Sequence, residues 1–214
     1  MLLALDTASP LVSVALYDAD GAGVVTEHLA ERPMKHAEQL APLIDLAMST
    51  AGIVRQDLTA IAVGVGPGPF TGLRVGLVTA RTLGFVLDIP VYGVCSLDAL
   101  AVEAVETGAV DRDFVVATDA RRKEVYLARY DADGVRLEGP LVDKPAVLAT
   151  DGPVVGQGAE LYPEDFPHRV GPGAPSAGWL ARVVAEERAE LSDPDPLYLR
   201  RPDAATGHTP KRVS

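Results

Sequence analysis

Apolar residues along the chain follow two spacings, one typical of helices and one typical of strands. They recur at helical spacing over residues 35–51 and again over 72–87, while short apolar runs at 61–66 and 90–94 are typical of buried strands. A further helical pattern covers residues 97–106. Because a strand hairpin and a third strand precede these segments, the pattern predicts an α/β fold.

One stretch of the chain occurs twice. Residues 3–21 and 116–134 align without gaps, with roughly half of their positions identical, and both end in Asp-Ala-Asp-Gly. Each copy has an apolar run, an Asp, a polar turn and a second alternating run, which predicts a β-hairpin. Such self-similarity predicts two related halves, which we place at residues 1–105 and 106–214.

Each hairpin is followed by a segment that can add a third strand, at residues 24–29 and 135–142. The second half then has fewer elements, with a Gly-Gln-Gly turn at 156–158 and a helical pattern over 177–191. The sequence from Asp193 onward is punctuated by prolines, which predicts an extended tail. The second half should therefore be the smaller of the two.

The charge balance of the chain limits what it can bind. Its 214 residues carry a formal net charge of −11, and the resulting field repels the phosphate backbone of nucleic acids. RNA should therefore be held by another subunit. The single Cys95 cannot form an internal disulfide, and Arg74, Arg81 and Asp88 interrupt the longest apolar stretch before it reaches the length of a membrane span. Since Asp6 also interrupts the apolar N-terminus, we expect a cytoplasmic protein without membrane contact.

The glycine- and proline-rich loop at residues 64–76 holds the most chemistry. It lies between a predicted strand and a predicted helix, where backbone amides and a helix N-terminus can bind an anion. It is not a Walker loop, because Leu73 and Arg74 stand where Lys and Ser or Thr are required, and Pro69 removes the third glycine of a dinucleotide motif. The alternative, that the prolines only stiffen a tight turn, is equally strong. The candidates for binding an anion or nucleotide here are Gly66, Gly68, Thr71 and Arg74.

Small residues recur at every fourth position of the helix predicted at 72–87. Gly72, Gly76, Ala80 and Gly84 form one stripe along this helix. Each glycine costs a helix about 1 kcal/mol relative to alanine, so the stripe indicates that another backbone packs closely against it. That backbone belongs either to the chain's own sheet or to a helix of a partner, and the sequence leaves both alternatives open.

Four motifs together resemble one protein family. They are Asp6-Thr7-Ala8-Ser9, the loop at 66–76, Asp119-Ala120-Arg121-Arg122 with the following Glu124-Val125-Tyr126, and Tyr198-Leu199-Arg200. In these residues, and over nearly its whole length, the chain resembles the TsaB family, also called YeaZ. The resemblance implies an actin-like (ASKHA) α/β fold built from two duplicated ribonuclease H-like subdomains, of which the second is truncated.

The resemblance also implies a role in transferring a threonylcarbamoyl group to adenosine in tRNAs that read ANN codons. The chain would be a non-catalytic subunit that dimerises with TsaD, the catalytic paralogue, engages the ATPase TsaE, and meets tRNA only through the complex. Since the paralogues share a surface, the isolated chain should form a homodimer. The implied contact surface consists of the two helices of the first half. Its candidate residues are Leu40, Leu43, Ile44, Ala47, Leu73, Gly76, Leu77, Ala80 and Gly84.

The catalytic paralogue holds a metal with two histidines that follow the strand equivalent to residues 90–94. We align Ser96 and Leu100 with those histidines, and neither side chain can form a transition-metal site. The four histidines of the chain have no ligand spacing, and the sequence has neither a His-Glu-x-x-His segment nor a nucleophile elbow. We therefore predict no metal and no catalytic residue, which argues against a metallopeptidase.

Nucleotide chemistry remains as an alternative. In actin-like enzymes the two Asp-bearing hairpins help to hold Mg²⁺ and phosphates, and Asp6, Thr7 and Asp119 keep suitable side chains here. Gly156 and Gly158 resemble a remnant of the adenosine-binding segment. The turn after Asp119 is basic, which is more typical of a surface or interface element. We predict no resident cofactor, leave open weak or interface-shared binding of ATP or ADP, and keep an actin-like ATPase or kinase acting on a small substrate as the alternative function.

Overall fold

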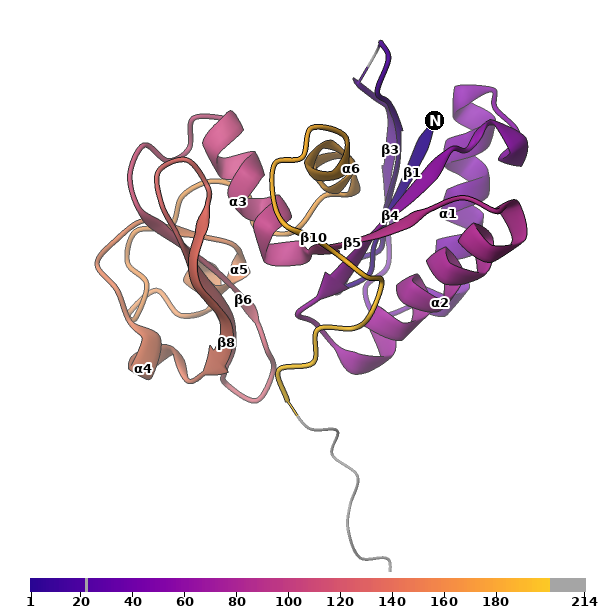
Figure 1. Cartoon of the computed structure of the whole chain (residues 1–214). Helices are drawn as coiled ribbons and strands as arrows, with labels where there is room; N and C mark the ends of the chain where they lie inside the picture. Colours follow the sequence, from indigo (N-terminus) through magenta and orange to yellow (C-terminus); the bar gives the residue numbers. More distant parts are fainter. Residues whose placement is uncertain (22, 201–214) are drawn as a thin grey trace, which may run out of the picture.

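The computed structural model describes residues 1–21 and 23–200 and shows two lobes, each built on one β-sheet (Figure 1). The sheet of the first lobe has six strands in the order β10-β5-β4-β1-β2-β3. These strands are β1 (Leu2–Asp6), β2 (Ser13–Asp18), β3 (Gly23–Leu29), β4 (Ala60–Gly66), β5 (Val91–Cys95) and β10 (Leu191–Ser192). The central strands β1 and β4 are almost continuously apolar and buried, as expected for parallel neighbours that are covered on both faces.

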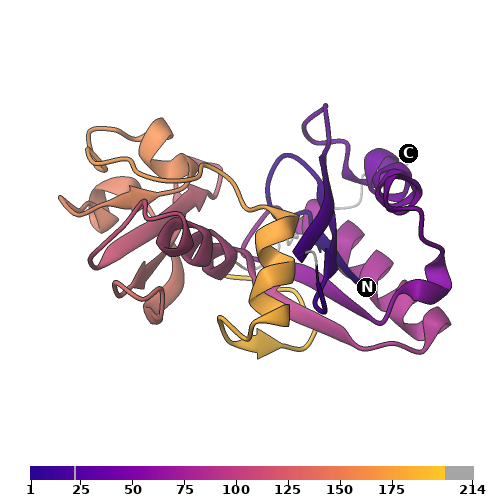
Figure 2. The same ribbon diagram turned by 90° about the horizontal axis from the view of Figure 1, so that it is seen from above.

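Helices cover both faces of this sheet (Figures 1 and 2). They are α1 (His36–Ala51), α2 (Phe70–Leu87), α3 (Ser96–Glu106) and α6 (Ala177–Ala185). Because side chains alternate along a strand, Leu3 and Leu5 of β1 join the core beneath α1 and α2, whereas Leu2 and Ala4 join the core beneath α6. α3 lies between the lobes and contributes to the cores of both.

The second lobe repeats the first hairpin on a smaller scale. Its sheet has the order β8-β7-β6-β9, and β6 pairs antiparallel with β7 and parallel with β9, as β1 does with β2 and β4. Its elements are β6 (Phe114–Asp119), β7 (Val125–Tyr130), β8 (Arg136–Asp143), α4 (Pro145–Leu148), β9 (Val154–Val155) and α5 (Gln157–Leu161). The matching order and direction confirm the predicted α/β, actin-like fold with a truncated second unit.

After the second sheet the chain returns to the first lobe. The helix predicted at 177–191 ends at Ala185, because Glu187 has a left-handed φ of 52° and the amide of Arg188 donates to the carbonyl of Val183. This helix, α6, contacts β1, β2 and β3, and β10 pairs with β5. By their contacts, these parts of the range 106–214 belong to the first lobe.

Residues 193–200 run between the lobes (Figure 1), and we call them the C-terminal strap. They are followed by a basic stretch with Arg201, Lys211 and Arg212, which lies outside the described residues.

Among the described residues, α2 is the one helix that is long and apolar enough to be considered as a membrane span. One face of α2 nevertheless packs inside the lobe, because its own residues Leu73, Gly76 and Ala80 are buried. We therefore interpret α2 as a core helix of the first lobe.

Candidate functional site

The end of β1 and the glycine loop are pressed together. A Cβ atom at Gly68 would lie 2.4 Å from the carbonyl oxygen of Ala8, and one at Gly76 would lie 2.4 Å from Oγ1 of Thr7. No side chain fits at either position, so these glycines are required for close packing. The structure thus packs the loop glycines against the end of β1, at Asp6 and Thr7. Little space remains between the loop and this end of β1.

The carboxylate of Asp6 is bonded within the chain. Its Oδ2 accepts a hydrogen bond from Oγ of Ser96 at 2.6 Å, and its Oδ1 accepts one from the amide of Ala8 at 2.8 Å. Burial raises the pKa of Asp6 to about 6, and these hydrogen bonds and the charge of His36 oppose the rise. His36 is itself buried, with Nε2 2.8 Å from the carbonyl oxygen of Ser9. A Mg²⁺ ion or phosphate at Asp6 would have to replace these bonds.

Replacing Asp6 with Asn should stabilise the protein at pH 8 and change its stability little at pH 4. Because the pKa of Asp6 is raised in the folded state, the folded protein binds the proton more tightly than the unfolded chain, so stability falls as the pH rises from about 4 to about 6. Asn can still accept from the amide of Ala8 and has no charge to bury. At 1.36 kcal/mol per pKa unit, the gain is on the order of 3 kcal/mol.

Urea denaturation of the parent and Asp6→Asn proteins at pH 4, 6 and 8 measures this difference. An effect of the same size at all three pH values would contradict the raised pKa.

Between the lobes lies a cavity of about 30 Å³, which is comparable to the volume of one water molecule. Its lining includes Ser96, Thr118, Asp119, Arg121 and Gln157, so it occupies the cleft where the two Asp-bearing hairpins approach each other. A nucleotide requires several hundred Å³. With the lobes in this arrangement, the cavity has no room for one.

The predicted site residues of the second lobe are also engaged within the chain. Oδ1 of Asp119 accepts from the amide of Arg121 at 2.8 Å, and Oδ2 lies 3.5 Å from the Arg121 guanidinium. A Cβ atom at Gly156 or Gly158 would lie within 3 Å of Ala117. These two glycines allow the segment around α5 to pack against β6, which explains the Gly-Gln-Gly sequence without a ligand.

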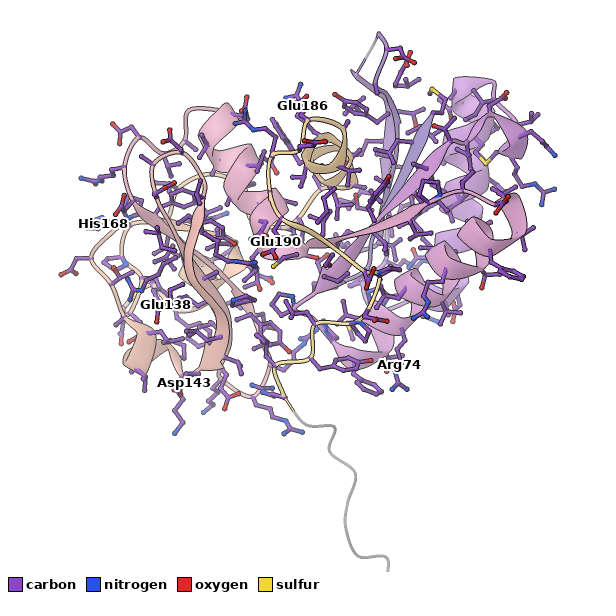
Figure 3. All side chains as sticks on the ribbon, in the orientation of Figure 1. Arg74, Glu138, Asp143, His168, Glu186 and Glu190 are labelled. Carbon is purple, nitrogen blue, oxygen red and sulfur yellow. The ribbon has the colours of Figure 1, made fainter. Side chains whose placement is uncertain are left out.

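Arg74 and Thr71 are exposed at the start of α2 and do not point into the cavity. Nε of Arg74 donates to the hydroxyl of Tyr198 at 3.0 Å, and its guanidinium lies 3.6 Å from the centre of the Phe70 ring. Figure 3 shows Arg74 at the lower edge of the first lobe, beside the C-terminal strap. The structure therefore directs Arg74 to the strap and not to an anion at the loop.

The positions aligned with the paralogue's metal ligands have other roles. Ser96 donates to Asp6, and Leu100 is fully buried in the core between the lobes. Across residues 1–21 and 23–200, no three His, Cys, Asp or Glu side chains are grouped so that they could hold a metal ion.

Comparison with known proteins identifies the family. Residues 12–204 match the family model described as TsaD: tRNA N6-adenosine threonylcarbamoyltransferase. An uncharacterized protein of Mycobacterium tuberculosis is 42% identical over 206 residues, covering 95% of this chain and 93% of that protein. The tRNA threonylcarbamoyladenosine biosynthesis protein TsaB of Escherichia coli is 33% identical over 174 residues, covering 76% of this chain and 74% of that protein. The structure of YeaZ from Pseudomonas aeruginosa is 30% identical with a TM-score of 0.75, covering 92% of this chain and 99% of that one.

The chain belongs to the TsaB (YeaZ) family. This confirms the resemblance based on the four motifs.

In this TsaB-family chain the small-residue stripe of α2 faces its own sheet. A Cβ atom at Gly72 would lie 2.7 Å from the carbonyl oxygen of Thr7, and one at Gly84 would lie 2.3 Å from Cγ2 of Val91. The interface prediction must be corrected for the residues that are buried within the chain and cannot reach a partner. These are Leu40, Ile44, Ala47, Leu73, Gly76, Leu77, Ala80 and Gly84, while Leu43 is half-buried.

The opposite side of α2 carries apolar residues that the sequence analysis missed. Val78, Phe85 and Val86 are 63%, 88% and 69% exposed, and together with Thr82 they share one side of the helix by their spacing. We call these four residues the α2 outer face. The sequence does contain a signal for this second apolar face. Apolar residues occur all round α2, whereas a helix with only one buried side needs them on that side alone.

Proposed function

We propose that the chain is a non-catalytic subunit in the biosynthesis of tRNA threonylcarbamoyladenosine and pairs with a TsaD-type paralogue. Membership in the TsaB family supports a role in this biosynthesis. The single observation that supports a non-catalytic role is the closed cleft, where both oxygens of Asp6 are bonded within the chain and the remaining cavity is about 30 Å³. An actin-like kinase or ATPase would need a cleft with enough space for its nucleotide.

The paralogue would dock on the α2 outer face. Exposed apolar clusters of this kind mark protein interaction sites, and the 88% exposed Phe85 is a suitable central anchor. In the absence of the paralogue, two copies of the chain would pair through the same face. TsaE would be a further partner, and tRNA would be contacted only through the complex, since the net charge of −11 disfavours direct contact with RNA.

We propose no resident cofactor for the isolated chain. Any ATP or ADP would be bound at an interface, where a partner supplies the remainder of the site.

Reconstitution tests this proposal. The chain, the TsaD paralogue and TsaE are combined with threonylcarbamoyl-adenylate and tRNA, and the modified nucleoside is quantified by mass spectrometry. We expect modification when the chain and the paralogue are both present, and none with the chain alone. The Asp6→Asn variant should support modification as well as the parent does.

Two results would contradict a non-catalytic role. One is modification of tRNA by the chain alone. The other is ATP hydrolysis by the chain alone that is lost in Asp6→Asn, which would favour the kinase or ATPase alternative.

A further inference from the structure

The C-terminal strap contacts both lobes. The amide of Leu197 donates to the carbonyl of Val65 at the end of β4, at 2.9 Å, and the Leu197 side chain packs against the cores of both lobes. Leu199 packs against the core between the lobes. The strap therefore lies along the junction, as Figure 1 shows, and is not a free tail.

On the first lobe the strap is anchored at the start of α2. The ring of Tyr198 stacks on that of Phe70, with 4.9 Å between the ring centres, and its hydroxyl accepts from Arg74 at 3.0 Å. Asp195 forms an ion pair with Arg81 at 3.0 Å, but both side chains are more than half exposed. Exposed pairs contribute about 0–1 kcal/mol, so Tyr198 is the main anchor on this side.

On the second lobe the anchor is Arg200. Its Nη1 donates to the carbonyl of Ala120 at 2.8 Å, and its guanidinium forms an ion pair with Glu124. Ala120 and Glu124 flank the basic turn at 121–123, in which all three residues have left-handed φ values of 56° to 62°. Such a backbone is unfavourable for residues other than glycine and persists only where its surroundings hold it. Backbone hydrogen bonds from the amide of Ala120 to the carbonyl of Glu124 and from the amide of Glu124 to the carbonyl of Arg121 close this turn, and Arg200 contacts both of its ends.

We propose that the strap is a latch that fixes the second lobe against the first, and that release of Arg200 or Tyr198 allows the lobes to separate. Both anchors are partly solvent-exposed side chains. The other contacts between the lobes include the buried core around α3 and two exposed contacts, from Arg121 to Sδ of Met34 and from Arg136 to Glu190. Partly exposed contacts of this kind break before the buried ones do, so the two anchors should release before Leu197 and Leu199 leave the cores. Opening would widen the 30 Å³ cavity, so the latch controls access to the closed cleft.

Distance measurements between spin labels test this proposal. Cysteines introduced at Val54 on the first lobe and Val147 on the second are labelled, since both positions are exposed. Native Cys95 is buried with a pKa raised to about 12, so it should not react with the label. An excess of unlabelled protein removes distances between copies. We expect one narrow distance distribution in the parent.

Arg200→Ala should broaden this distribution and add a population at longer distance. The matched control is Arg81→Ala, which removes an exposed ion pair of the same strap and should leave the distribution unchanged. Tyr198→Ala releases the first-lobe end and should act as Arg200→Ala does, which provides a second test if one variant does not fold. The parental distribution in both Arg200→Ala and Tyr198→Ala would overturn the latch, and so would equal broadening by Arg81→Ala.

Discussion

Replacing Phe85 with Glu should abolish the stable complex with the TsaD-type paralogue and leave the fold unchanged. The Phe85 side chain is 88% exposed in the isolated chain, so the substitution should change the free energy of unfolding by no more than about 0.5 kcal/mol. In an apolar interface the new carboxylate would be buried without a partner. Truncation of central anchors weakens binding by about 2 kcal/mol or more, roughly 30-fold, and a buried charge adds to this loss. Calorimetric titration with the paralogue measures the affinity.

The control is Val147→Glu, which makes the same kind of change at a 66% exposed position on α4 of the second lobe. It should bind the paralogue with the parental affinity. Phe85→Glu should also weaken the homodimer of the isolated chain, because both assemblies would use the α2 outer face. Parental affinity in Phe85→Glu would rule out this face as the contact surface, and weak binding by Val147→Glu would point to the second lobe.

The fold could be predicted because its main signals are local. Each hairpin combines an apolar strand, a short turn and a second strand within about twenty residues, so the repeat was visible along the chain. The return of the chain to the first lobe had no such signal. Leu191 pairs with Val94, nearly a hundred residues earlier, and the sequence around Leu191 does not identify its partner.

The candidate site was harder to predict because its chemistry depends on distant contacts. A glycine stripe indicates close packing, but the same residues would serve a partner helix or the chain's own sheet. Only the positions of Thr7 and Val91 decide between them. Likewise, Asp6 has the residue type of a metal ligand. Only its hydrogen bond with Ser96, ninety positions away, reveals that its carboxylate is already bonded within the chain.

The largest loss of stability is expected for Gly64→Ala. A Cβ atom at Gly64 would lie 2.0 Å from Oδ2 of Asp6 and 2.8 Å from Oγ of Ser96. Gly64 is in β4, a central strand between β1 and β5, so its backbone has little freedom to move away. The methyl group would break the hydrogen bond between Asp6 and Ser96 and leave a buried carboxylate without that donor. Overpacking costs about 1–3 kcal/mol and loss of a buried partner about as much again, so we expect a loss of about 2–6 kcal/mol.

Thermal and urea denaturation measure this loss, with Gly152→Ala as the control. At Gly152 the nearest atom to a new Cβ would be Oγ1 of Thr150 at 3.4 Å, an ordinary contact, so the control should keep the parental stability. The cause can be isolated with a second substitution. Asp6→Ala removes the carboxylate that the new methyl group would overlap, so Gly64→Ala should cost less in that background than in the parent. An equal loss of stability in both backgrounds would show that strand β4 itself requires glycine at position 64, and that the hydrogen-bonded carboxylate of Asp6 does not.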